Sequence, residues 1–358
     1  MGEPLSGLPA KRFWSGKRVL LTGHTGFKGS WLALWLARLG AQVAGYALPP
    51  STVPSLFELA CGPDIITSHT GDIRDNTTLR SLIRNFEPEI VLHLAAQALV
   101  RPSYDDPVET FSVNGLGVAH ILDCVREGRT IRVVVVATTD KVYRNQGRGR
   151  LYREDDPLGG HDPYSASKAA AEIIVASYRD AFLSQRGIAV ATARAGNVIG
   201  GGDWSKDRLI PDLVRAWKSS TVLHVRRPDA VRPWQHVLEP AAGYLVLAER
   251  MWTDSTLSGA WNFGPHPEEA TTVRQVVELA RGIFDVAKVD FASTPDGPYE
   301  SDWLALDISK AQQVLGVRPR WRLHEAIDRT MQWYLSLHGG ADPRSLCETQ
   351  ISEYESTV

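Results

Sequence analysis

The fold is decided by residues 17–40, which read KRVLLTGHTGFKGSWLALWLARLG. The apolar run of residues 17–23 predicts a buried β-strand, and the apolar face of residues 27–40 predicts an α-helix that a glycine closes. Three glycines lie where the strand meets the helix: Gly23, Gly26 and Gly29. Glycines at this junction let the chain turn sharply and let a pyrophosphate approach the backbone at the positive end of the helix. The stretch therefore predicts a dinucleotide site.

The same alternation of strand and helix patterns continues along the chain. Short apolar runs predict strands at residues 41–47, 64–70, 89–95, 131–138 and 188–195, and helical patterns separate them at residues 76–86, 107–126 and 162–185. Nearly continuous apolar strands with helices between them favour a parallel sheet covered on both faces. We predict an α/β fold with a doubly wound, Rossmann-type sheet, whose ligands sit at the carboxyl ends of the strands.

The alternation weakens after about residue 200, where glycines and tryptophans interrupt shorter strands. We expect residues 13–200 to form the dinucleotide-binding domain, with part of residues 240–270 returning to it. Residues 201–240 and 265–338 are expected to form a smaller C-terminal substrate-binding lobe. Residues 339–358 are expected to be a weakly packed tail.

The composition excludes several classes of protein. Lysine and arginine total 39 against 41 aspartates and glutamates, so a net charge of −2 predicts neither a nucleic-acid nor an anionic-membrane surface. No apolar run approaches the length of a membrane helix. Cys61, Cys124 and Cys347 lie far apart and no HExxH motif occurs, so we expect no disulfide framework, no metal site and a cytoplasmic protein.

A YxxxK motif, Tyr164 to Lys168, falls within the helical pattern of residues 162–185. Positions i and i+4 share a helix face, and a nearby ammonium group favours the phenolate and lowers the pKa of a tyrosine. Tyr164 could then act as a base on a hydroxyl group. Alone, the motif could also be a chance pairing on one face.

The GxxGxxG loop and the YxxxK motif together resemble the extended branch of the short-chain dehydrogenase/reductase superfamily, which modifies nucleotide sugars. The resemblance implies NAD as the cofactor and a homodimer formed through the helices at residues 107–126 and 162–185. It also implies cofactor contacts by these residues: Gly23, Thr25, Gly26, Phe27, Lys28, Gly29, Asp72, Ile73, Leu94, Ala95, Ala96, Gln97, Tyr164 and Lys168. Asp72 could instead be a plain turn residue.

One departure concerns the end of the second strand, where residues 45–49 read GYALP. A carboxylate there would bind the ribose 2′-hydroxyl and repel a 2′-phosphate. Its absence leaves NAD and NADP undecided by the residues alone. The preference for NAD comes from the resemblance.

The segment after the fifth strand, Thr139-Asp140-Lys141, resembles the threonine and acid pair of nucleotide-sugar 4,6-dehydratases, with lysine in place of the second acid. Water loss across C5 and C6 needs a base for the C5 proton and an acid for the C6 hydroxyl. A carboxyl group kept protonated suits the acid, and a partly desolvated lysine suits the base. Alternatively, Asp140 caps the next turn and Lys141 faces water.

Several longer stretches resemble the dehydratase subgroup that carries this Asp-Lys pair and uses CDP-glucose: residues 23–31, 54–58, 96–104, 194–204 and 232–237. The resemblance implies that Asn197, Arg208 and Arg232 bind the substrate diphosphate. Arg101 and Tyr104 are expected near the sugar, although a solvated surface role is open for the arginines. Trp204, Trp234 and Trp303 are expected to pack the lobe. The competing functions are a nucleotide-sugar 4-epimerase, which needs no Asp-Lys pair, and a non-catalytic dinucleotide sensor, which needs no Tyr-Lys pair.

Overall fold

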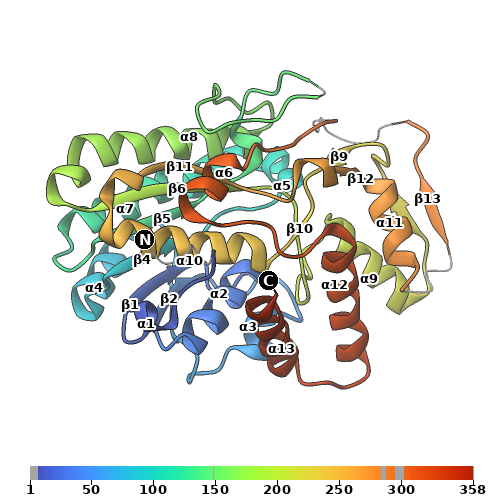
Figure 1. Cartoon of the computed structure of the whole chain (residues 1–358), viewed down its shortest axis with the longest axis horizontal. Coiled ribbons are helices and arrows are strands. Elements are labelled where there is room, and N and C mark those ends of the chain that lie inside the picture. Colours follow the sequence, from blue (N-terminus) through green and yellow to red (C-terminus); the bar gives the residue numbers. More distant parts are fainter. Residues whose placement is uncertain (1–6, 148, 284–287, 295–301, 358) are drawn as a thin grey trace.

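The computed structural model describes residues 7–147, 149–283, 288–294 and 302–357. Its centre is a seven-stranded sheet in the order β11-β6-β5-β4-β1-β2-β3, with every neighbouring pair parallel (Figure 1). The strands are β1 Arg18–Thr22, β2 Gln42–Ala47, β3 Thr67–Thr70, β4 Ile90–His93, β5 Val133–Ala137, β6 Ala189–Ala195 and β11 Gly259–Phe263. The predicted doubly wound sheet is confirmed, and β3 begins three residues later than the sequence pattern indicates.

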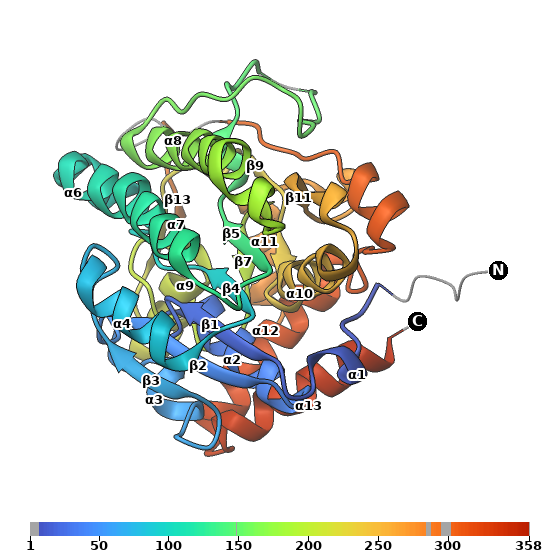
Figure 2. The same ribbon diagram turned by 90° about the vertical axis from the view of Figure 1, so that its left-hand side faces the viewer.

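Alternate residues of the strands feed two separate cores, as expected of a sheet covered on both faces. Leu21 of β1 belongs to the core that contains α2 and α10, whereas Leu20 belongs to the core that contains α4, α7 and α8. Figure 2 shows α7 and α8 side by side on one face of the sheet. The helices of these layers are α2 Phe27–Arg38, α4 Asn76–Phe86, α6 Pro107–Phe111, α7 Gly117–Glu127, α8 Pro163–Tyr178 and α10 Leu238–Thr253.

Short strand pairs and helices gather beyond the carboxyl end of the sheet, on the right in Figure 1. The pairs are β7 Val198–Ile199 with β10 Gln235–His236, β8 Leu223–Val225 with β13 Val289–Phe291, and β9 Val231–Arg232 with β12 Thr271–Thr272. The nearby helices are α9 Leu209–Ser219, α11 Val273–Arg281 and α12 Leu323–His338, and three short helices lie elsewhere: α1 Lys11–Trp14, α3 Leu56–Ala60 and α5 Val100–Asp105.

The C-terminal residues form helix α13, Pro343–Ser356, so the weakly packed tail predicted for residues 339–358 is wrong. Trp35 of α2 donates a hydrogen bond from Nε1 to Glu355 Oε1 at 2.9 Å. Three side chains of the helix are at most 1% exposed: Cys347, Ile351 and Tyr354. Their spacing of i, i+4 and i+7 makes a narrow apolar face, which the polar residues between them conceal in the sequence. In the described part of the chain, no helix is long and apolar enough to cross a membrane.

Candidate active site

The glycine loop between β1 and α2 divides its glycines between two tasks. Gly23 has a φ of +75°, and a Cβ atom there would lie 2.6 Å from the nitrogen of Ala95. A Cβ atom on Gly29 would lie 2.2 Å from the carbonyl oxygen of Gly23. At Gly26 the nearest atom is that same oxygen at 3.4 Å. Gly23 therefore lets the loop pack against the segment after β4, Gly29 lets α2 pack against the loop, and Gly26 keeps open the space in front of the loop.

A cavity of about 520 Å³ lies against this loop, and we call it the glycine-loop cavity. It runs from Leu48 and Asp72, beside the ends of β2 and β3, to Tyr164 and Lys168 on α8. Every cofactor residue predicted from the sequence lines it: Gly23, Thr25, Gly26, Phe27, Lys28, Gly29, Asp72, Ile73, Leu94, Ala95, Ala96, Gln97, Tyr164 and Lys168. The glycine cradle, the helix N-terminus and the length of the cavity fit a dinucleotide.

The ribose end of the glycine-loop cavity is built from small hydroxyl residues, Ser51 and Thr52, after β2. Asp72 lines the cavity too, although its carboxylate is held by the Arg74 guanidinium at 2.6 Å. Among the described lining residues, Asp72 and Asp203 are the only carboxylates. Asp72 therefore has both of the roles considered for it: its carboxylate holds the turn through Arg74, and the residue lines the cavity.

A second cavity of about 250 Å³, which we call the arginine cavity, opens between the sheet and the lobe. The two cavities share Lys28, Thr138, Tyr164, Asp203 and Arg208 among their lining residues. The remaining predicted catalytic and substrate residues on its wall are Thr139, Asp140, Lys141, Arg101, Asn197 and Arg232. A group bound in one cavity therefore meets a group bound in the other beside Tyr164.

The turn after β5 aims its acid into the arginine cavity. Thr139, and not Asp140, caps this turn, because the Thr139 hydroxyl accepts from the backbone N–H of Lys141 at 3.4 Å and donates to Asp140 Oδ1 at 3.0 Å. Asp140 is 1% exposed, and Oδ2 has no hydrogen-bond partner. Burial raises the pKa of Asp140, against the opposing charges of Lys141, Arg232 and Lys28. Lys141 is half-buried and lines the same cavity.

Tyr164 and Lys168 lie one turn apart on α8, whose N-terminus Asp162 caps. Burial raises the pKa of Tyr164 to about 12, and a hydrogen bond with Thr139 lowers it only in part. Lys168 donates from Nζ to the carbonyl oxygen of Ala137 at 3.2 Å, and burial lowers its pKa to about 8. The pKa of Tyr164 is therefore raised, and not lowered as the sequence predicts, because desolvation is the largest influence on it.

The arginine cavity has an excess of positive charge. Its wall carries five arginines and two lysines against four aspartates: Arg101, Arg208, Arg226, Arg227, Arg232, Lys28, Lys141, Asp140, Asp203, Asp207 and Asp212. Asp207 accepts from Arg226 at 2.8 Å and from Arg101 at 3.4 Å, and Asp203 accepts from Arg208 at 3.0 Å. Such a wall suits a diphosphate, because guanidinium groups match phosphate oxygens.

The structure separates some residues that the sequence grouped. Tyr104, predicted to lie near the sugar, is 38% exposed and lines neither cavity. Trp234 lines the arginine cavity and Trp204 the glycine-loop cavity, although both were expected only to pack. Arg226 and Arg227 were missed, and their adjacency after an apolar strand was the available signal. Among the described residues, no group of three His, Cys, Asp or Glu side chains could hold a metal ion.

A glycine loop on a parallel sheet, joined at Tyr164 to a basic cavity, defines a Rossmann-type enzyme that works on an anionic substrate. A family model described as GDP-mannose 4,6 dehydratase matches residues 20–330, and the chain belongs to this family. A CDP-glucose 4,6-dehydratase of Salmonella typhimurium is 47% identical over 354 residues, which cover 97% of this chain and 99% of that protein. A dTDP-glucose 4,6-dehydratase of Xanthomonas campestris is 26% identical over 343 residues, 88% of this chain and 93% of that one.

Solved structures share the fold. The epimerase Mth375 of Methanothermobacter thermautotrophicus has a TM-score of 0.81 at 23% identity and covers 92% of this chain and 95% of its own. The UDP-glucose 4-epimerase of Thermus thermophilus, solved in complex with NAD, has a TM-score of 0.74 at 27% identity, with 89% and 99% covered. Because epimerases and dehydratases share this architecture, side chains must distinguish their activities.

Proposed function

We propose that this protein converts CDP-glucose into CDP-4-keto-6-deoxyglucose and water with NAD as a recycled cofactor, which makes it a hydro-lyase. One observation carries the proposal: the Asp140–Lys141 pair lines the same cavity as Tyr164. A 4-epimerase needs the tyrosine but has no use for an acid and an amine beside it. The relationship to the Salmonella CDP-glucose 4,6-dehydratase supports the same reaction and the same nucleotide.

The first step oxidises C4 of the glucose ring. Tyr164 accepts the proton of the C4 hydroxyl, and Thr139 hydrogen-bonds the same oxygen. NAD, held by the residues of the glycine-loop cavity, would supply the acceptor for the C4 hydride and the donor of hydride to C6. Lys168, on the next turn of α8, places positive charge on the same helix face and favours the Tyr164 phenolate that accepts this proton.

The second step removes water across C5 and C6. The C4 ketone acidifies the C5 proton, which the Lys141 amine accepts. Asp140, kept in its acid form by burial, donates a proton to the departing C6 hydroxyl. The hydride then adds to C6, and Lys141 returns its proton to C5.

Proton balance over the cycle involves Thr139. At the end of a turnover Tyr164 holds the proton of the C4 hydroxyl, and Asp140 lacks the proton that left in water. The Thr139 hydroxyl donates to Asp140 Oδ1 at 3.0 Å, and Thr139 lines the arginine cavity together with Tyr164, whose pKa it lowers. It therefore connects the residue with a surplus proton to the residue that needs one.

The two cavities divide the substrate from the cofactor. Residues 13–200, with part of 240–270, are assigned to NAD, and residues 201–240 and 265–338 to the nucleotide sugar. Asn197, Arg208 and Arg232 bind the diphosphate, with Arg101 at the same wall. The end of β2 carries no carboxylate that would repel a 2′-phosphate, so a preference for NAD over NADP would depend on the shape of the glycine-loop cavity. Binding of NAD and NADP should therefore be measured side by side.

The experiment that tests this function uses CDP-glucose labelled with deuterium at C4. A dehydratase moves the label to C6 and releases water, whereas a 4-epimerase returns the label to C4. Parallel reactions with UDP-, dTDP- and GDP-glucose, followed by mass and NMR, test the nucleotide. Label confined to C4, or no reaction with any of the four substrates, would refute the proposal.

We further propose a homodimer formed through α7 and α8. Exposed apolar side chains of α6, of the segment that leads into α7 and of α8 would form the patch that this pairing covers: Val108 is 78%, Leu116 58% and Ile173 61% exposed. Pairing of these helices across a two-fold axis would bury the patch in a four-helix bundle. Sedimentation velocity of the protein and of Ile173→Asp should give a dimer and a monomer, and a monomeric unaltered protein would contradict the proposal.

A cytoplasmic location and a role in making deoxysugars for polysaccharide complete the proposal. The three cysteines are unpaired thiols, two of them buried, which suits a reducing compartment. The 4-keto-6-deoxy product is suited to further reduction or transamination of its carbonyl group. Cell fractionation tests the location, and loss of deoxysugar from the polysaccharide of a deletion strain tests the role.

A further inference from the structure

The catalytic helix carries a third buried ionisable residue on the same face as Tyr164 and Lys168. Glu172 follows Lys168 by four residues, so it lies one turn further along α8. It is 5% exposed, and it lines neither cavity. The proposed reaction does not use it. A buried carboxylate is costly unless it is fully paired, so its presence directly behind Lys168 calls for an explanation.

Four hydrogen bonds satisfy the Glu172 carboxylate. Thr138 donates to Oε1 at 2.5 Å and Thr192 donates to Oε2 at 2.7 Å. Arg194 of β6 approaches in the bidentate manner, with Nε 3.0 Å from Oε1 and a terminal nitrogen 2.8 Å from Oε2. These donors stabilise the ionised form, so Glu172 stays negative in the interior.

The network reaches the catalytic residues at two points. Thr138 lies directly before Thr139 and lines both cavities. The residue before it, Ala137, accepts the hydrogen bond of Lys168. Arg194 also donates to the hydroxyl of Tyr143 at 2.8 Å, two residues after Lys141. The Glu172 carboxylate is thus linked, directly at Thr138 and through Arg194 at Tyr143, to both ends of the segment that presents Thr139, Asp140 and Lys141.

We propose that Glu172 is a positioning residue for the dehydration, which keeps Lys168 in its charged form beside Tyr164. The inference rests on the proposed function, because that reaction gives Lys168 its role. Burial lowers the pKa of Lys168 to about 8, and the charge of Glu172 opposes this shift. A pKa of 8 leaves about nine-tenths of the amine charged at pH 7, whereas a pKa one unit lower leaves about half.

Other charged or titratable groups face this pair from several elements. His93 of β4 is neutral across the working range, because burial lowers its pKa to about 3. Lys28 of α2 titrates in the same range as Lys168, with a pKa lowered to about 8 by burial. Lys28 and His93 interact with Lys168, and Arg194 with its neighbours Tyr143 and Glu154 interacts with Glu172 or lies next to it. A test must therefore follow Lys168 separately from Lys28.

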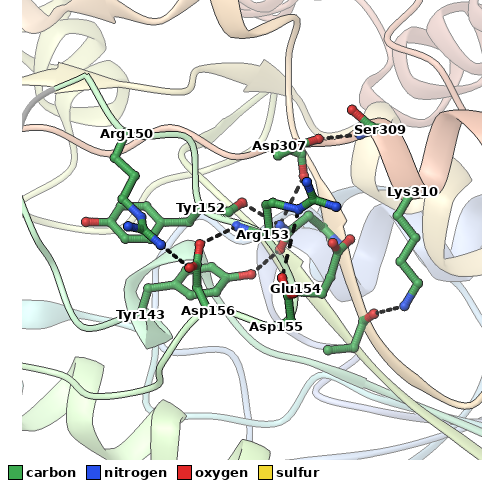
Figure 3. Close-up of polar contacts among 12 residues, drawn as sticks. Tyr143, Arg150, Tyr152, Arg153, Glu154, Asp155, Asp156, Asp307, Ser309 and Lys310 are labelled. Atoms are coloured by element: carbon green, nitrogen blue, oxygen red, sulfur yellow. Dashed lines mark hydrogen bonds and ion pairs between the residues drawn. The ribbon is translucent and has the colours of Figure 1, made fainter.

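The outer part of the network holds Arg194 in place. Tyr143 donates to Asn262 Oδ1 at 2.6 Å, and Asn262 N–H donates to Glu154 Oε1 at 2.9 Å. Figure 3 shows Tyr143 beside Tyr152, whose ring it stacks on at 5.1 Å, and Glu154 in the strap of residues 150–156. Arg194 also donates to the backbone oxygen of Glu154 at 3.1 Å. The strap thus contacts the Glu172–Arg194 pair through Arg194.

The test is a pulse of acetic anhydride across a pH series, with the acetylation of each lysine measured by peptide mass spectrometry. In Glu172→Gln the midpoint for Lys168 should fall by about one pH unit or more, since a neighbouring opposite charge shifts a pKa by about 1 to 3. The midpoint for Lys28 should stay in place. Thr192→Val is the matched control, because it removes one hydrogen bond from the same carboxylate and leaves its charge.

The alkaline limb of kcat with CDP-glucose should move with the Lys168 midpoint in Glu172→Gln and stay in place in Thr192→Val. Where Glu172→Gln does not fold, Glu172→Gln/Arg194→Met removes both buried charges, and the Lys168 midpoint should fall by less than in the single variant, because the loss of the Arg194 charge acts in the opposite direction. An unmoved Lys168 midpoint in a folded variant without the Glu172 charge overturns the inference. The labelling needs no substrate, so it is separate from a failure of the proposed function, which would appear as an inactive unaltered protein.

Discussion

Asp140→Asn separates oxidation of the sugar from loss of water. Asparagine keeps an oxygen that can accept the Thr139 hydroxyl, now 3.0 Å from Oδ1, so the turn after β5 should be retained. The change falls on Oδ2, which is buried and has no partner, and it removes the carboxyl group whose pKa burial raises. Loss of a general acid costs about 10²- to 10⁴-fold, so water loss should slow by that factor while the first hydride transfer continues.

The assay follows three signals in deuterated water: absorbance of the reduced nicotinamide, exchange of the C5 proton, and formation of the 6-deoxy product. Asp140→Asn should build up reduced nicotinamide and exchange C5 while product formation falls. Lys141→Ala should lose both C5 exchange and product but still bind cofactor. The control is Asp155→Asn, a carboxylate that is 87% exposed in its side chain. Product formation by Asp140→Asn at a rate close to that of the control would remove Asp140 from the mechanism.

Three other expectations concern single features of the structure. Tyr164→Phe should slow the first hydride transfer by about two orders of magnitude or more in single-turnover measurements, and an unchanged rate would contradict its role as base. Gly26→Ala should weaken NAD binding, measured by calorimetry, without lowering the melting temperature. Gly29→Ala, with its Cβ 2.2 Å from a carbonyl oxygen, should lower both the NAD affinity and the melting temperature. Equal losses of melting temperature in the two variants would refute the different roles given to these glycines. Burial lowers the pKa of His93 and of His236 to about 3, so the unfolded chain binds more protons between pH 3 and 6.5. The free energy of unfolding should fall on acidification through that window by about 1 to 3 kcal/mol for each histidine, and urea unfolding that is independent of pH there would contradict this.

The sheet was predictable because its signal is local. Residues 19–21 and 133–137 are uninterrupted apolar runs, and a parallel sheet covered on both faces requires such strands. The helix at residues 343–356 was not predicted, because its burial depends on α2 and α3, about 300 residues earlier in the chain. Three apolar residues spaced along a polar segment indicate a helix face only when the surface that receives them is known.

The candidate site shows the same division between local and long-range information. The glycine loop and the Tyr164–Lys168 spacing could be read from short stretches, because a turn and a helix face are set by neighbours in the chain. The pKa of Tyr164 could not, because desolvation by the lobe raises it above the value expected beside an ammonium group. Arg226 and Arg227 reach the cavity from β8 and the loop after it, which no motif of the sheet domain contains.

The turn after β5 explains how one fold supports both a reversible oxidation and a dehydration. In the proposed mechanism, oxidation at C4 uses Thr139, Tyr164 and Lys168. Dehydration adds two side chains on the next two residues of the same turn, Asp140 and Lys141, with no change in the sheet or in α8. Thr139 caps that turn and hydrogen-bonds the acid, so the residue that holds the C4 oxygen also fixes the acid for the C6 hydroxyl. On this proposal the side chains of the turn determine the reaction. Solved epimerases share the architecture of this chain, so the fold alone does not reveal the chemistry of Asp140 and Lys141.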